Sequence, residues 1–194
     1  MKKKNVILAA ILLTGTASSA LAAETVSSVF AAGNIYAVGS LGYTTSLDKV
    51  ANAPSLAGLV GYQINSSWGI WGVEGGLVSL ARNANTTELP PTVVGQVKVI
   101  GLALAGVYTH PINEQYSVLL RAGFSNLDST ETLVSSTSSS STSNTSNGVL
   151  YGIAVQYKLN QKIAIRAGLD RYNYSLRNNA GILNNFNVSA VYKF

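Results

Sequence analysis

The chain has 194 residues, of which 47% are hydrophobic and only 11% are charged. Soluble domains usually carry about 25% charged residues, so this composition disfavours an ordinary soluble protein. Lys and Arg number 13 against 8 Asp and Glu, but three lysines lie within the first four residues, and without them the balance is 10 − 8 = +2. So small an excess does not indicate a nucleic-acid-binding protein. Cysteine is absent, which excludes disulfides and a lipoprotein anchor.

The N-terminus has the three parts of a secretory signal peptide. Lys2 to Lys4 precede an apolar run over residues 6–13, and small residues ending in Ala20-Leu21-Ala22 follow. The run is far shorter than the ~20 residues of a membrane-spanning helix. We therefore expect export, with cleavage after Ala22 or Ala23. The expected division is a signal peptide over residues 1–22, a lead-in over 23–32 and a barrel domain over 33–194.

Beyond this leader, eight segments alternate large apolar side chains with polar or small ones, which is the period of a strand. In chain order the expected strands cover about 33–44, 56–65, 70–82, 96–110, 115–126, 149–159, 162–174 and 184–194. No apolar stretch after the leader approaches the length of a spanning helix. An apolar composition without such a helix favours a closed β-barrel. Like a helix, a closed barrel gives every backbone N–H and C=O group in lipid a hydrogen-bond partner. The predicted fold class is all-β: an eight-stranded antiparallel up-and-down transmembrane β-barrel.

The connections between these segments alternate short and long, as in a barrel with tight periplasmic turns and longer surface loops. Short turns are expected at Asn65-Ser66-Ser67, at residues 110–114 and at Asn160-Gln161. Between Ser135 and Ser146 every residue except Asn144 is Ser or Thr. Such a low-complexity polar run is interpreted as a long mobile loop. Whether it is a solvated spacer or an adhesive site stays open.

The last strand has two faces of opposite polarity. One face carries Phe186, Val188, Ala190, Tyr192 and Phe194, and the other carries Asn185, Asn187, Ser189 and Lys193. The chain stops on an aromatic residue, with a tyrosine two places before it. This ending resembles the terminal strand of bacterial outer-membrane barrels, in which a final Phe is part of the signal read by the barrel-assembly machinery. Tyr192 and Phe194 are therefore the candidate assembly signal.

Aromatic side chains on the outward faces should form a belt at each membrane interface. Near the periplasmic end these are Tyr62, Trp71, Tyr108, Tyr116, Tyr157, Tyr192 and Phe194. Near the other end they are Tyr43, Phe124, Tyr151 and Phe186. Tyr172 and Tyr174 have the inward parity, and the pattern gives them no role beyond filling the outer mouth or a bulge.

Charged residues in the middle of strands should point into the barrel. A lysine or arginine facing lipid near the midplane costs about 2–4 kcal/mol, and buried charges must be paired. Alternation places Glu74, Arg121 and Arg166 on the inward faces, and we predict a lumen network of these three with Asp170, joined by Gln63 and Gln156. The interior of an eight-stranded barrel is just wide enough for side chains to fill it. Polar filling and a functional gate remain as alternatives for the network.

Enzymatic chemistry finds little support in the sequence. Some small outer-membrane barrels are lipid A acylases or deacylases, and these reactions need a histidine beside a serine or a carboxylate. The histidine of this chain, His110, is expected in a periplasmic turn. No metal-ligand cluster, phosphate-binding glycine loop or cofactor motif is present. We expect no catalytic site, no cofactor and no metal.

Four segments of the chain resemble the OmpA-like family of small eight-stranded outer-membrane barrels. They are Ile35-Tyr36 through Gly42-Tyr43, Trp71 to Gly76, Arg166 to Tyr172, and Tyr192-Lys193-Phe194. In that family an acidic residue of the third strand pairs in the lumen with an arginine of the seventh, which implies a pair of Glu74 with Arg166. The peptidoglycan-binding domain of full-length OmpA has no counterpart in this sequence, so its role is not carried over.

Two functions follow as hypotheses. The first is a structural and surface-interaction barrel that supports the envelope and presents its loops for adhesion or recognition. The second is a small gated channel or solute-binding barrel. The expected location is the outer membrane of a Gram-negative bacterium. The expected partners are outer-membrane lipid and lipopolysaccharide, the barrel-assembly machinery, and host-surface or phage ligands at the loops, with no nucleic acid and a monomeric state.

Overall fold

The computed structural model describes residues 34–46, 52–85, 93–135, 139–176 and 179–194. The chain divides into two units, Met1–Ala31 and Ala32–Phe194, and all described residues belong to the second. The expected signal peptide and the whole of the lead-in lie outside the described residues. Among the described residues, no helix is long and apolar enough to cross a membrane.

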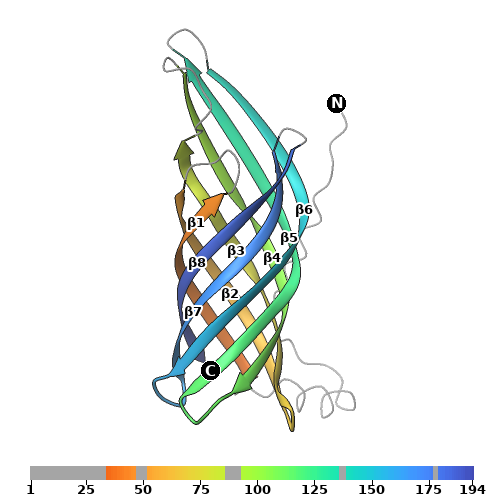
Figure 1. Cartoon of the computed structure of the whole chain (residues 1–194), viewed down its shortest axis with the longest axis vertical. Helices are drawn as coiled ribbons and strands as arrows, with labels where there is room; N and C mark the ends of the chain where they lie inside the picture. The colour runs from red at the N-terminus through yellow and green to blue at the C-terminus, as the bar shows by residue number, and fades with distance from the viewer. Residues whose placement is uncertain (1–33, 47–51, 86–92, 136–138, 177–178) are drawn as a thin grey trace, which may run out of the picture. The chain divides into compact units, whose positions relative to one another are not determined.

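The described residues form eight antiparallel strands that close into a barrel (Figure 1). The strands are β1 Ile35–Ser46, β2 Ala53–Ser66, β3 Gly69–Asn85, β4 Val93–Pro111, β5 Tyr116–Ser135, β6 Ser139–Lys158, β7 Ile163–Leu176 and β8 Asn179–Lys193. Each strand pairs with its neighbours in the chain, and β8 pairs with β1 to complete the wall. The predicted fold class is confirmed.

Three short turns and the C-terminus lie at one end of the barrel, which we call the inner end (Figure 1). The turns are residues 67–68, 112–115 and 159–162. The first turn was predicted at Asn65-Ser66-Ser67, but β2 continues through Ser66 and the turn is Ser67-Trp68. The shift follows from Gly69, whose φ of 142° is readily adopted only by glycine. Polar residue types alone did not indicate which residue would carry that conformation.

The serine- and threonine-rich segment is largely a strand, so the prediction of a long loop over residues 135–146 was wrong. Residues 139–146 of β6 pair with residues 127–134 of β5, from Val134 with Ser139 to Leu127 with Ser146. The two strands form a hairpin that runs past the ends of β7 and β8 (Figure 1). The loop prediction assumed that a polar segment must bury apolar side chains to be ordered. In this hairpin the backbone of β5 provides the ladder instead.

Side chains of the hairpin hydrogen-bond across the two strands. Asn126 Nδ2 donates to Asn147 Oδ1 at 2.6 Å, Thr145 Oγ1 donates to Asp128 Oδ1 at 2.5 Å, and the hydroxyls of Thr130 and Ser143 lie 3.3 Å apart. These bonds lie between directly opposite residues of the ladder. Such cross-strand polar pairs stabilise a sheet modestly. The hairpin is therefore ordered by its own pairing and by the pairing of its β5 strand with residues 93–100 of β4.

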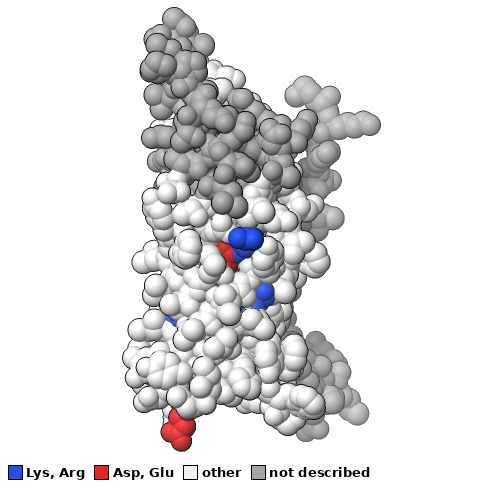
Figure 2. Space-filling view, viewed as in Figure 1, with Lys and Arg blue, Asp and Glu red and all other residues white. Residues whose placement is uncertain are grey.

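The outward face of the barrel wall is apolar, and the face shown in Figure 2 carries very few charged residues among those described. Large apolar side chains exposed on it include Leu41, Leu56, Val60, Leu77, Leu102, Leu104, Leu120, Ile153, Ile165 and Val188. At the inner end, aromatic rings pair on this face: Trp71 with Tyr108, Tyr116 with Tyr157 and Tyr192 with Phe194, with centroids 4.7, 5.0 and 5.3 Å apart. Towards the other end, which we call the outer end, Tyr43, Phe124, Tyr151 and Phe186 are exposed.

Strict alternation fails in the outer part of β3. The register against β4 shifts between Ser79 and Ala81 and again between Ala81 and Ala84, so β3 has one extra residue at each point. These bulges allow Leu80 and the adjacent Ala81 both to be buried. A period of two read from the sequence cannot show where such a bulge interrupts it.

Candidate functional site

Four charged residues meet inside the barrel about halfway along it. They are Glu74 of β3, Arg121 of β5, and Arg166 and Asp170 of β7, and each is at most 8% exposed. Arg166 Nη1 lies 2.7 Å from Glu74 Oε1, and Arg121 Nη1 lies 2.8 Å from Asp170 Oδ2. Arg121 Nε lies 3.2 Å from Glu74 Oε2, an ion pair without hydrogen-bond alignment. The two carboxylates and the two guanidiniums therefore alternate in a row of ion pairs whose net charge is zero.

Neutral side chains add hydrogen bonds to this network. Tyr36 Oη donates to Glu74 Oε1 at 2.9 Å, Asn187 Nδ2 donates to Asp170 Oδ2 at 3.0 Å, and Arg166 Nη2 donates to Gln156 Oε1 at 3.3 Å. Sequence reasoning named Gln156 but missed Tyr36 and Asn187. Both have the inward parity of their strands, and that parity is the signal that could have found them. Gln63, also named, lines the cavity described below.

Two glycines make room for the network. Gly61 lies opposite Tyr36 in the ladder, and a Cβ at Gly61 would collide with the tyrosine ring. Gly152 lies opposite Asp170, and a Cβ there would collide with the carboxylate Oδ1. The network therefore depends on residues that contribute no side chain to it.

Beyond the network, towards the outer end, the lumen is filled mainly by apolar side chains. Nine of them are at most 6% exposed: Leu59, Val78, Leu80, Val97, Val99, Leu127, Leu150, Tyr172 and Leu183. On β3, Val78 and Leu80 follow Glu74, and on β7 Tyr172 follows Asp170, so these side chains lie nearer the outer end than the charges. Beside them, Asn185 Nδ2 donates to Thr44 Oγ1 and Ser55 Oγ. This packing leaves a space of about 20 Å³ next to the network.

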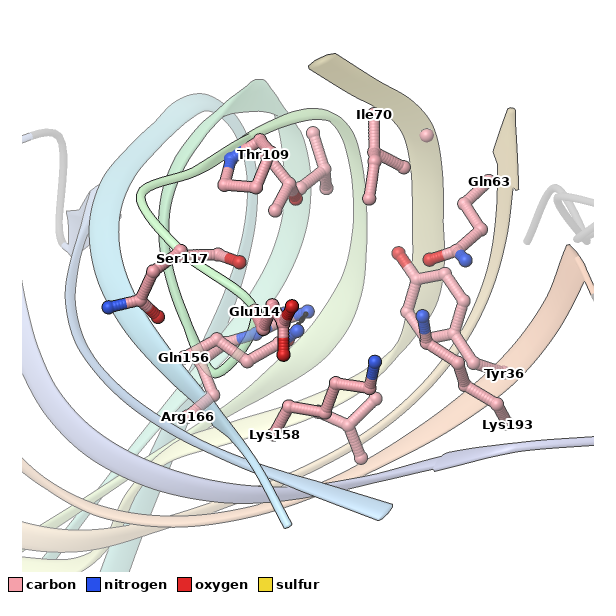
Figure 3. A pocket seen from close by; sticks show the side chains of 15 residues that line it. Tyr36, Gln63, Ile70, Thr109, Glu114, Ser117, Gln156, Lys158, Arg166 and Lys193 are labelled. Atoms are coloured by element: carbon pink, nitrogen blue, oxygen red, sulfur yellow. Dashed lines mark hydrogen bonds between the residues drawn. The ribbon is translucent and has the colours of Figure 1, made fainter. Parts of the chain in front are cut away.

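Towards the inner end the lumen holds a cavity of about 260 Å³ (Figure 3). Its polar lining includes Gln63, Thr109, Glu114, Ser117, Gln156, Lys158, Arg166 and Lys193. Arg166 belongs both to the network and to this lining. The cavity therefore reaches from the short turns to the charged network.

His110 is not among the residues that line the cavity. It is an exposed residue near the end of β4, adjacent to the turn in which it was predicted. Its ring Nδ1 lies 3.4 Å from the hydroxyl of Tyr108. Among the described residues, no group of three or more His, Cys, Asp or Glu side chains could hold a metal ion.

A sequence profile of the outer-membrane protein beta-barrel domain family matches residues 8–194. The chain belongs to this family. The closed wall of eight strands agrees with that membership. The resemblance to small outer-membrane barrels found in the sequence is therefore confirmed, and the protein is an outer-membrane β-barrel.

Solved structures of small outer-membrane barrels share the fold of this outer-membrane barrel. Ail, the attachment invasion locus protein of Yersinia pestis, is 20% identical with a TM-score of 0.53, and the match covers 83% of this chain and 99% of Ail. Neisserial surface protein A is 14% identical with a TM-score of 0.52, covering 82% and 96%. Ail in complex with the heparin analogue sucrose octasulfate matches with 21% identity and a TM-score of 0.51, covering 83% and 97%. No match was found among curated protein sequences.

The C-terminal residues of this outer-membrane barrel lie at the inner end of the wall. Phe194 N donates to Ile35 O at 3.1 Å, which fastens the last residue to the first strand. Tyr192 and Phe194 are 43% and 58% exposed, and their rings meet edge to face. Both rings are thus accessible from outside the wall.

Proposed function

We propose that this outer-membrane barrel has a structural and surface-interaction role. It supports the envelope as a closed cylinder and presents its long hairpin for adhesion or recognition. The observation that carries the proposal is the length of the hairpin. The last apolar outward pair is Phe124 with Val149, and β5 continues from there to Ser135. At ~3.4 Å per residue, these 11 residues add about 37 Å of strand beyond that pair.

The chemistry of the hairpin supports contact with polar surfaces. Among the side chains that the structure describes, those on its outward face beyond Phe124 are amides, hydroxyls and one carboxylate, including Asn126, Asp128, Thr145 and Asn147. These groups donate and accept hydrogen bonds but bury little apolar area. We infer that the partner is a glycan or a polar protein surface, bound by many weak contacts.

The names of the similar structures suggest the first ligands to test. Ail is named for attachment and invasion and has been solved with a heparin analogue, and the neisserial protein is named as a surface protein. At their low identity these names guide the choice of probe only. Sulfated glycans and host-cell surfaces are the probes we would try first.

A hairpin-shortened variant tests the proposal. In this variant residues 128–145 are removed and Leu127 is joined to Ser146, its ladder partner, through an Asn-Gly turn. We expect the barrel to fold, because all pairs from Leu127 towards the inner end are kept and only residues 93–100 of β4 lose their β5 partners. We expect the variant to lose whole-cell binding to host cells or heparin. Folding is checked by the heat-dependent shift in gel mobility, and surface amounts are matched before binding is compared. Unchanged binding at matched amounts would overturn the surface role of the hairpin.

The apolar filling of the outer lumen supports this role over a gated channel. Even if the pair of Glu74 with Arg166 opened, an ion would still meet Leu59, Leu127 and their neighbours. We therefore propose that the network is polar filling and that planar bilayers will show no stable openings. Openings that disappear on replacing Glu74 or Arg166 would favour the channel instead.

We also propose how the protein reaches its site. Residues 1–22 direct export, and Tyr192 and Phe194 present the assembly signal to the barrel-assembly machinery before the monomer is inserted among lipid and lipopolysaccharide. The exposed, accessible rings of both residues support this assignment. A Phe194→Ser variant should accumulate unassembled in the periplasm, whereas Phe186→Ser, on the same face near the outer end, should assemble.

A further inference from the structure

Two lysines line the cavity at the inner end: Lys158, which is exposed, and Lys193, which is half-buried. Lys158 is the last residue of β6 that pairs with β7, and Lys193 is the last residue of β8. Both side chains line the cavity. Their ammonium groups extend into the same space (Figure 3). In the described part of the chain neither forms an ion pair, and Glu114 is the one carboxylate in the lining.

The charge of the cavity is positive once the network is counted. Glu74, Asp170, Arg121 and Arg166 balance one another, so Arg166 brings no net charge. Lys158 and Lys193 against Glu114 then leave 2 − 1 = +1. Like charges in a lumen with low-dielectric walls repel more strongly than in bulk water, and an anion between them relieves that repulsion.

The cavity lining is also rich in hydrogen-bond donors. Arg166 contributes part of its side chain to the lining, although that side chain is only 5% exposed. Ser117 provides a hydroxyl and Gln156 an amide in the same lining. Charged and neutral N–H and O–H donors of this kind are suited to an oxyanion, which offers several acceptor oxygens.

We propose that this cavity binds a phosphate group, either inorganic phosphate or a small phosphate monoester. A phosphate carries one to two negative charges at neutral pH and offers oxygens to both lysines and to the donors of the lining. About 260 Å³ admits a phosphate with several waters or with a short carbon chain. The site opens at the end of the short turns, so its ligand comes from the periplasm or from the inner leaflet. It is separate from the hairpin proposed for surface binding.

Calorimetric titration of the folded full-length barrel in a maltoside detergent tests the proposal. Inorganic phosphate and glycerol 3-phosphate are titrated separately at constant ionic strength, with sodium chloride as the reference salt. We expect saturable binding near one site per barrel for at least one of them. The compound that binds more tightly identifies the source of the natural ligand. Tighter binding of inorganic phosphate indicates a free ion, and tighter binding of glycerol 3-phosphate indicates a lipid headgroup.

Variants with matched charge changes decide whether the lysines form the site. Lys158→Gln should weaken binding about tenfold, the loss expected for one charge-assisted hydrogen bond. Lys162→Gln removes the same charge from the neighbouring turn, outside the cavity, and should bind as the parent does. Lys193→Gln is compared only if it shows the gel-mobility shift of the folded barrel. The proposal is overturned if neither phosphate compound binds saturably, or if Lys158→Gln and Lys162→Gln bind alike.

Discussion

On β3, Glu74 and Leu80 lie six residues apart and both point into the lumen, but different forces hold them there. Glu74 is 1% exposed and contacts two guanidiniums and a phenol. Leu80 is 2% exposed and lies among the buried apolar side chains of the outer half. The inner half of the lumen combines directional ion pairs with an open cavity, and the outer half is filled by close packing.

The difference shows how the two halves respond to change. An apolar cluster depends on total volume and tolerates swaps that conserve it. An ion-pair network depends on equal numbers of positive and negative charges, because removal of one partner leaves the other charge buried and unpaired. Substitutions that change the side-chain volume by a similar amount should therefore lower the free energy of unfolding more in the network than in the apolar half.

The largest effect is expected for Glu74→Gln. The side chain keeps its size, but Arg121 and Arg166 are left with Asp170 alone, an excess of one buried positive charge. We expect the free energy of unfolding to fall by about 3–5 kcal/mol, measured by urea titration in lipid vesicles with tryptophan fluorescence. The double variant Glu74→Gln with Arg166→Gln restores the balance and should recover part of the loss. A single variant no less stable than the double would contradict the charge argument.

The next effect is expected in the outer half, for Leu127→Ala. Leu127 is fully buried, and its truncation leaves a cavity in a packed cluster. Such substitutions cost about 2–5 kcal/mol. The matched control is Leu120→Ala on the outward face of the same strand, where Leu120 is 52% exposed and lipid can fill the space. Equal losses for the two variants would show that the outer lumen is not closely packed.

A smaller effect is expected for Gly152→Ala. The added methyl group would collide with Asp170 Oδ1 and push the carboxylate from its place beside Arg121. Overpacking of this kind costs about 1–3 kcal/mol. Gly39→Ala is the control, because a Cβ at Gly39 meets nothing within 4 Å. If both variants unfold at the same urea concentration, the space beside Asp170 is not limiting.

Alternation was sufficient to predict the wall and the faces of most of its residues. The period of two placed Glu74, Arg121, Arg166 and Asp170 in the lumen, because a strand of a closed barrel has lipid on one side and side chains on the other. Tyr36 and Tyr172 have the same inward parity, but the pattern gave them no partners. Partners depend on the relative stagger of strands far apart in the chain, which the pattern of a single strand does not contain.

Two features could not be predicted for separate physical reasons. The bulges at Ser79 and Ala81 are local insertions that no residue type requires. The strand over residues 139–146 lies beyond the apolar band, where both faces are polar and alternation disappears. Order there depends on the partner strand and not on burial, so composition indicated a loop.

The smallest effect is expected in the hairpin, where a polar contact is made in water. Thr145 donates to Asp128 there, whereas Tyr36 donates to Glu74 inside the barrel. Thr145→Val should change the free energy of unfolding by no more than about 0.5 kcal/mol, because water replaces the lost bond to the exposed carboxylate. Tyr36→Phe removes a hydrogen bond to a buried carboxylate and should cost about 1.5–3 kcal/mol. Urea titration of both variants compares nearly the same bond in two surroundings, and equal losses would mean that the lumen screens charge as water does.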